Sequence, residues 1–245
     1  MERIAVLADV HGVLPALEAV LAEDDVRSAD AIVLAGDNAS GPQPVETLDL
    51  LTSLGDRVVW VRGNADRELV EMARAAFTGE PPDAVSPWAA QQLRPDQVEL
   101  LAPLPTSVTI GDALFCHATP RDDEEMVLVD SPISRWAEVF TGLSEDVRTV
   151  VCGHTHMPFA RQVDRRLVIN AGSVGMPYGA PGPSWALLTP DGVQLRRAPL
   201  DAVKAAERIT TESTYPGRQE WVEEYLLTNY SDTEALDAFR PRAEG

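Results

Sequence analysis

Short apolar runs recur along the first 190 residues of the chain and are separated by polar segments. Several of them, such as IAVLA near the N-terminus and AIVLA after residue 30, are almost continuously hydrophobic. Such runs are typical of strands that are covered on both faces of a sheet. The pattern predicts strands at residues 3–9, 31–37, 57–64, 107–110, 113–118, 149–156, 166–173 and 184–190.

Helical periodicity lies between the first three of these runs. Residues 14–25 carry Pro15 near their start, and residues 44–54 are followed by Gly55. Proline at the first helical turn and glycine just after the last turn are helix boundary signals. The first 65 residues therefore predict a βαβαβ unit, which is the pattern of a largely parallel sheet with crossover helices.

The rest of the chain changes character twice. Residues 67–103 are helical apart from a proline-rich break, and beyond residue 107 closely spaced strands predict antiparallel or mixed β-structure with a helix near 131–142. We expect one main domain over residues 1–200 and a helical, acidic extension over residues 201–245. An apolar stripe of Trp221, Tyr225 and Leu226 predicts that this extension packs back on the domain or forms a homo-oligomer contact.

The amino-acid composition excludes some classes of binding partner. The chain has 245 residues and a formal net charge of −19. That charge argues against a nucleic-acid polymer, whose binding needs Lys and Arg, and against an anionic membrane surface. The apolar N-terminal stretch is short and broken by Asp9, unlike a signal peptide, so we expect a cytoplasmic protein. Cys116 and Cys152 end apolar runs and are expected to be buried, reduced thiols.

Polar side chains lie at the ends of five of the predicted strands. All four histidines of the chain belong to this set. In open α/β sheets, sites form beyond the carboxyl ends of strands, so these side chains are expected to meet. The set is Asp9, His11, Asp37, Asn64, His117, His154 and His156.

These residue types point to metal chemistry. Carboxylate, amide and neutral imidazole groups together bind divalent transition metals. Seven ligands are too many for one ion but suit two ions that share a carboxylate, and two ions about 3.5–4 Å apart can hold the attacking and leaving oxygens of an in-line displacement at phosphorus. In an extended segment, His154 and His156 would point the same way and approach neighbouring ions together.

The series D-x-H, G-D, G-N-x-D, H and G-H-x-H resembles the calcineurin-like metallophosphoesterase superfamily, most closely its small bacterial and archaeal phosphodiesterases. The resemblance covers residues 3–200, including NAGSVGMP at 170–177. It implies an α/β fold, a four-layer α/β/β/α sandwich of two mixed sheets flanked by helices. It also implies two divalent metal ions, with Mn as the leading candidate and Fe, Zn, Co or Ni as alternatives.

The resemblance also implies roles for the ligands. Asp9, His11 and His156 would hold the first ion, and Asn64, His117 and His154 the second. Asp37 would bridge both, together with a hydroxide that attacks phosphorus.

One position departs from the family pattern. Phosphatase-type members have histidine after the motif asparagine, where this chain has Ala65. Alanine donates no proton, and a positioned general acid contributes roughly 10²–10⁴ in rate. We therefore expect a strong dependence on leaving-group acidity. Asp66 is expected to contact the ligand residues without binding metal itself, and the alternative is an exposed charge at a turn. Catalysis is expected to depend on Asp37, Asn64, His117 and Asp66.

Three functions remain open at this point. The leading hypothesis is a dinuclear metal-dependent phosphodiesterase for a small phosphate ester. The alternative is a phosphomonoesterase, including a phosphoprotein phosphatase, on the same site; the missing histidine and the acidic surface count against it. The third is a non-catalytic interaction scaffold, which the retention of all the ligand positions disfavours. Tyr178 is a further candidate for lining the substrate cleft.

Overall fold

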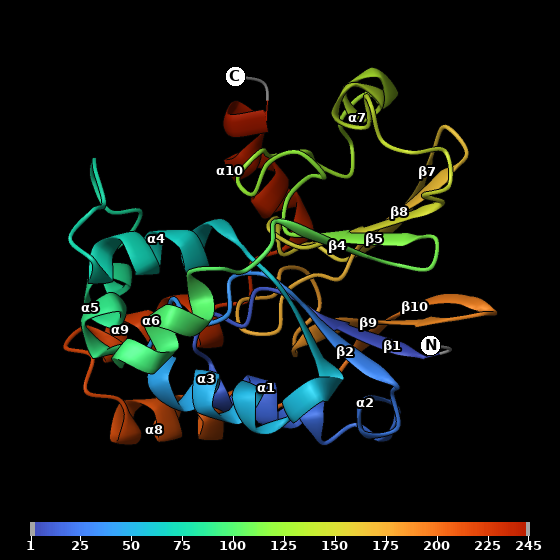
Figure 1. Cartoon of the computed structure of the whole chain (residues 1–245). Helices are drawn as coiled ribbons and strands as arrows, with labels where there is room; N and C mark the ends of the chain where they lie inside the picture. Colours follow the sequence, from blue (N-terminus) through green and yellow to red (C-terminus); the bar gives the residue numbers. More distant parts are fainter. Residues whose placement is uncertain (1–2, 244–245) are drawn as a thin grey trace.

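The computed structural model describes residues 3–243 and contains two five-stranded sheets packed face to face, with helices on the outer faces (Figure 1). The strand order is β10-β9-β1-β2-β3 in the first sheet and β4-β5-β6-β8-β7 in the second. The predicted sandwich of two mixed sheets flanked by helices is confirmed.

The first sheet is built around the predicted βαβαβ unit. Its strands β1 (Ile4–Leu7), β2 (Ala31–Ala35) and β3 (Val58–Val61) run parallel. The connections are α1 (Leu14–Leu21), α2 (Asp24–Arg27), α3 (Pro44–Ser53) and the short η1 (Gly55–Arg57). The helix predicted over 14–25 is interrupted, because Glu23 is extended with ψ of 134° and a separate turn then buries Val26.

The second sheet is also mixed. Strands β5, β6 and β8 run parallel, while β4 and β7 are antiparallel to their neighbours. The strands are β4 (Ser107–Ile110), β5 (Ala113–Cys116), β6 (Thr149–Cys152), β7 (Phe159–Val163) and β8 (Arg166–Asn170). The predicted helix near 131–142 is present as α7 (Ile133–Val139).

Two edge strands were not predicted. β7 ends the second sheet, and β10 (Gly192–Arg197) ends the first beside β9 (Ser184–Thr189). Neither contains a continuous apolar run, and both have exposed side chains, at Ala160, Gln162, Gln194 and Leu195. An edge strand is stabilised by pairing with one neighbour and needs little apolar burial, so hydrophobic runs do not reveal it.

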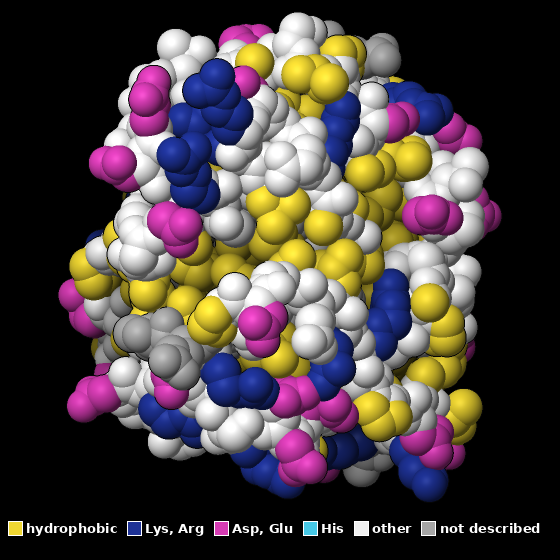
Figure 2. All heavy atoms as spheres, turned by 90° about the vertical axis from the view of Figure 1, so that its right-hand side faces the viewer, with side chains coloured by type: hydrophobic (Ala, Val, Ile, Leu, Met, Phe, Trp, Pro, Cys, Tyr) yellow, Lys and Arg dark blue, Asp and Glu magenta, His cyan; other side chains and the backbone are white. Residues whose placement is uncertain are grey.

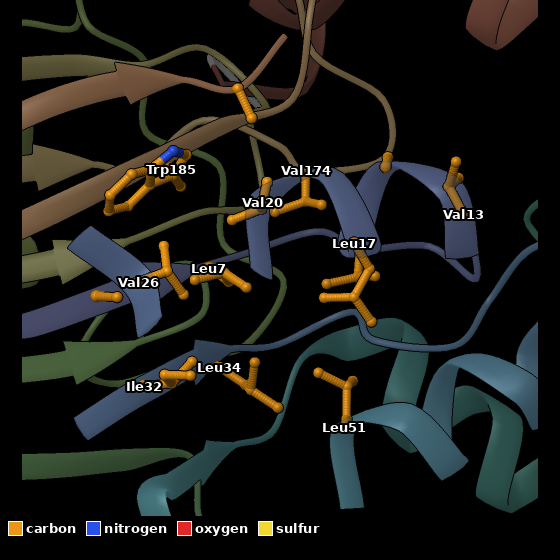
Figure 3. Packing of buried hydrophobic residues seen from close by; sticks show 14 of the residues in the cluster. Leu7, Val13, Leu17, Val20, Val26, Ile32, Leu34, Leu51, Val174 and Trp185 are labelled. Atoms are coloured by element: carbon orange, nitrogen blue, oxygen red, sulfur yellow. The ribbon is translucent and has the colours of Figure 1, made fainter. Parts of the chain in front are cut away.

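The helices cover both outer faces. Leu7, Leu17 and Leu34 meet between the first sheet and α1, and Trp185 lies on the same face (Figure 3). Completely burying a side chain of this size contributes roughly 1.5–3 kcal/mol. Between the two sheets, Phe115 and Val151 pack against Val6 and Val33. Cys116 and Cys152 are buried free thiols, as expected.

The segment predicted to be helical over 67–103 contains α4 (Asn64–Ala73), α5 (Val85–Gln92) and α6 (Pro95–Leu101). The C-terminal extension then contributes α8 (Ala202–Glu212), α9 (Arg218–Val222), the π-helical η2 (Glu223–Leu227) and α10 (Asp232–Ala243). Ile209 and Trp221 are buried in the core beside the first sheet, with Tyr225 and Leu226 packed against it. Ala235 of α10 packs with Leu128 and Met157. A homo-oligomer contact through this extension stays a prediction.

The starts of the parallel strands, and the ends of the antiparallel β4 and β9, lie at the opposite end from the polar site residues. Figure 2 faces this end and shows hydrophobic side chains gathered in a hollow. A cavity of about 290 Å³ lies here between the sheets, lined by residues that include Ile4, Ile110 and Leu188. Within residues 3–243, every helix is too short or too polar to cross a lipid bilayer.

Candidate metal centre and active site

The loops that follow β1, β2, β5 and β6 bring the predicted site residues together. Two groups form, and within each group the potential ligand atoms lie within 4.8 Å of one another. The first contains Asp9, His11 and His156, and the second contains Asp37, His117 and His154. Asn64, the first residue of α4, joins the second group because its Oδ1 lies 3.2 Å from His117 Nε2.

Five of these residues adopt a left-handed backbone. The φ angles of Asp9, His11, Asp37, His154 and His156 lie between 50° and 66°. Asp and His tolerate this region better than most residues, yet it still costs about 1–2 kcal/mol each. Backbone hydrogen bonds between neighbouring loops hold the conformation: Asp9 N donates to Gly36 O and His11 N donates to Asp37 O, each at 3.0 Å.

The expectation of an extended segment at the last histidine pair is therefore wrong. β6 ends at Cys152, and the chain turns through a loop in which His154 and His156 join different groups. The turn is fixed because His154 N donates to Asp9 Oδ2 at 2.9 Å. Gly153 permits this approach, since a Cβ there would lie 2.4 Å from the same carboxylate oxygen.

The first group contains two imidazole nitrogens with no proton between them. A carbonyl only accepts, so His11 Nδ1 donates to Ser40 O at 3.2 Å and His156 Nδ1 donates to Met176 O at 3.0 Å. In neutral rings, both Nε2 atoms then carry lone pairs, and they lie only 3.1 Å apart. Burial and the neighbouring His156 lower the pKa of His11, which favours its neutral form. A shared cation would turn this contact into an attraction.

The second group also favours a positive charge among its ligand atoms. His117 Nδ1 donates to Ala35 O at 2.7 Å, which turns Nε2 toward Asp37 Oδ2 at 3.2 Å. His154 Nε2 donates to Glu124 O at 3.0 Å and leaves Nδ1 available as a ligand. Burial acts to lower the pKa of His117, but Asp37 outweighs it and raises the pKa to about 10. The carboxylate thus holds a positive charge here, either as a proton or as a metal ion.

The two carboxylates reach both groups. Asp37 Oδ2 lies 3.2 Å from His117 Nε2 and 3.9 Å from His11 Nε2. Asp9 Oδ1 lies 3.4 Å from His156 Nε2 and 3.9 Å from His117 Nε2. Two nitrogens held about 2.1 Å from one ion, about 90° apart, would lie about 3.0 Å from each other. The donor types and the 3.1 Å spacing of His11 and His156 therefore fit divalent transition metals.

Asp66 lies behind the ligands and does not face them. It is completely buried, so the alternative of an exposed charge at a turn is wrong. Its Oδ2 accepts hydrogen bonds from Asp37 N and Gly63 N, each at 3.0 Å, and its Oδ1 accepts one from Asn38 N at 2.9 Å. Burial and the nearby Asp37 raise its pKa to about 6. The side chain ties the loop after β2 to the start of α4.

Ala65 sits beside the site, and its N–H donates to Asp37 Oδ1 at 2.8 Å. Tyr178, predicted to line the cleft, stacks on His156 with ring centroids 5.9 Å apart. One neighbour was missed by the sequence: Glu68 Oε1 accepts from Asn64 Nδ2 at 3.3 Å. Its spacing of four residues along a helix is the signal that could have found it. The carbonyl partners of the histidines leave no such signal, because every residue has a carbonyl.

The chain is similar to several known proteins. Residues 2–192 match the calcineurin-like phosphoesterase superfamily domain. The structure of a metallophosphoesterase from Sphaerobacter thermophilus is similar, with a TM-score of 0.74 and 25% identity over 91% of this chain and 98% of that one. Phosphodiesterase YfcE of Escherichia coli is 27% identical over 200 residues, which cover 78% of this chain and 89% of that protein. A symmetrical bis(5'-nucleosyl)-tetraphosphatase of Vibrio campbellii is 31% identical over 118 residues, covering 46% of this chain and 43% of that protein. The chain therefore belongs to the calcineurin-like phosphoesterase superfamily, and it is a phosphoric ester hydrolase.

Proposed function

We propose that this protein is a dinuclear metal-dependent phosphodiesterase that hydrolyses a small phosphodiester. One observation carries the proposal: in the first group, the lone pairs of His11 Nε2 and His156 Nε2 face each other at 3.1 Å when both rings are neutral. Buried acceptors in this arrangement repel one another unless a cation separates them. The first group therefore favours a bound cation, and Asp37 favours positive charge in the second group.

The ligands divide as the two groups do. Asp9, His11 and His156 would hold one divalent ion. Asn64, His117 and His154 would hold the other. Asp37, which faces both groups, would contact both ions. Manganese is the leading candidate, and the imidazole-rich donor set also suits Fe, Zn, Co or Ni. Bound ions of this kind would supply Lewis acidity to the phosphoryl oxygens and a nucleophilic water near neutral pH.

The chain's own residues decide which esters can react. Water adds to phosphorus, one P–O ester bond breaks, and its electron pair leaves on the ester oxygen, which must take up a proton. Ala65 stands where phosphatase-type members have a histidine, and it cannot donate that proton. Esters with acidic leaving groups are therefore favoured. The name of the E. coli relative, a phosphodiesterase that is 27% identical, supports the same class of substrate.

A paired rate assay tests this function. Manganese-loaded protein is given bis-p-nitrophenyl phosphate and p-nitrophenyl phosphate, with Asp37→Asn as the inactive control. We expect diester cleavage to exceed monoester cleavage at least about tenfold, and the control to lose at least about 10²-fold in kcat. A preference for the monoester would replace the proposal with a phosphomonoesterase. Two bound ions without cleavage of either ester would refute catalysis on these substrates and favour a scaffold.

A further inference from the structure

A cavity of about 370 Å³ opens beside His11, between the start of α5 and the C-terminal extension. Its walls include three aromatic rings, Tyr215, Trp221 and Tyr225, and we call it the aromatic cavity. Met176 lines it as well, and the carbonyl of Met176 is the group that orients His156. The aromatic cavity therefore borders the first ligand group directly. If the ligands hold the phosphorus of a substrate as proposed above, an ester arm on the side of His11 would extend into this cavity.

The rim of the aromatic cavity is acidic. Asp83, Glu220 and Glu224 line it with exposed carboxylates, and among the described lining residues none is Lys or Arg. The phenols respond to these charges: burial and then Glu224 raise the pKa of Tyr225 to about 12, while burial, Asp83 and Glu220 raise the pKa of Tyr215.

Arg218, the arginine of α9, offsets only part of this charge, because one positive charge stands against three carboxylates. The guanidinium of Arg218 donates to Thr210 O at 2.9 Å and to Tyr215 O at 3.0 Å. Two of its three nitrogens thus donate to backbone carbonyls of the extension, and Arg218 does not line the aromatic cavity. The aromatic cavity keeps a surplus of negative charge next to the place where phosphorus would bind.

We propose that the aromatic cavity receives one ester arm of the substrate and that this arm carries an alkylammonium group. Aromatic faces attract cations, and the attraction grows when carboxylates surround the same space. The carboxylates alone would not define a site; the cavity does so because it reaches His11 and is walled by rings. A further phosphate in the arm would instead meet like charge at Glu220 and Glu224. This inference rests on the proposed phosphodiesterase function and adds the substrate class.

A pair of matched chromogenic diesters measures the preference. p-Nitrophenyl phosphorylcholine carries a trimethylammonium arm, and p-nitrophenyl 3,3-dimethylbutyl phosphate carries an uncharged arm of the same shape. Both release the same leaving group, so a difference in kcat/KM reports the arm alone. We expect the cationic diester to be favoured at least about tenfold by the manganese-loaded full chain.

Two variants locate the preference in the molecule. Glu220→Gln/Glu224→Gln removes two carboxylates of the rim, and both positions are exposed, so folding should be retained. This variant should bring the ratio of cationic to neutral kcat/KM close to one, through a loss of kcat/KM on the cationic diester. Glu223→Gln is the matched control, because Glu223 is exposed, is the first residue of η2 directly after α9, and does not line the cavity. It should change the ratio less than about twofold.

A binding measurement separates recognition from turnover. Calorimetric titration of the same proteins with choline and with 3,3-dimethylbutanol should show binding of choline alone, lost in the double variant and retained in Glu223→Gln. A wild-type ratio near one, a ratio unchanged in the double variant, or faster cleavage of p-nitrophenyl thymidine 5'-phosphate than of the choline diester would overturn the inference. In each of these cases diester cleavage persists, so the proposed function stands. Failure to cleave any diester would remove both.

Discussion

Gly63→Ala is the sharpest test of the geometry of the second ligand group. Gly63 has φ of −95°, so alanine brings no backbone strain there. The added Cβ, however, would lie 2.1 Å from Asp37 Oδ1 and 2.5 Å from Asp37 N. Carbon and oxygen atoms need about 3.2 Å, so Asp37 must withdraw by about 1 Å. Rotation of its side chain is not enough, because the backbone nitrogen is too close as well.

The displacement has two costs of different size. Overpacking a dense interior costs about 1–3 kcal/mol of stability. The carboxylate that faces both ligand groups also loses its bond from Ala65 N, now 2.8 Å long, and its 3.2 Å contact with His117 Nε2. Misplacing a catalytic group by about 1 Å costs about 10²-fold in rate. We therefore expect kcat on bis-p-nitrophenyl phosphate to fall about 10²-fold, with only a modest loss of stability.

Gly55→Ala separates these two effects. Gly55 has φ of +64° and open space where a methyl group would be added, so alanine there costs about 1–2 kcal/mol through backbone strain without touching the site. Thermal unfolding and kcat are measured for both variants. Similar losses of stability with a rate loss confined to Gly63→Ala would support the reasoning. Wild-type activity in Gly63→Ala, or equal rate losses in both variants, would refute it.

Three further predictions use other contacts of the site. Ala65→His should raise the rate on alkyl diesters relative to aryl diesters about tenfold or more; an unchanged ratio would mean that leaving-group protonation does not limit the enzyme. Asp66→Asn should lower the free energy of unfolding by about 2–4 kcal/mol in urea titrations, because an amide has one acceptor oxygen where the carboxylate has two. A loss below about 0.5 kcal/mol would contradict the positioning role. The pKa of His117, raised to about 10 from 6.5, keeps a proton on this ring at pH 8 in metal-free protein. Metal binding should therefore release about one proton there, and isothermal titrations in buffers of different ionisation enthalpy that detect none would exclude this linkage.

The parallel strands of the first sheet and the set of ligand residues could be predicted from the sequence, because both follow from local sequence patterns. Near-continuous apolar runs predicted β1 to β3, since strands covered on both faces need apolar side chains at every position. Polar residues at the ends of parallel strands converge for a topological reason that needs no coordinates. Asp9, Asp37 and His117 were accordingly found before the fold was known.

Other features depend on contacts between distant segments, and only the tertiary structure decided them. β7 and β10 are strands because a neighbour offers hydrogen bonds, whatever their own polarity. His154 and His156 face different groups because the chain turns between them. That turn is held by the hydrogen bond from His154 N to Asp9, which lies 145 residues away in the sequence. The extension lines the aromatic cavity because Trp221 is buried against the first sheet. The sequence by itself determined the chemistry of the ligands, since residue type and strand-end position are local. The tertiary structure decided the turns that hold them and what surrounds them, since those follow from packing and hydrogen bonds across the whole chain.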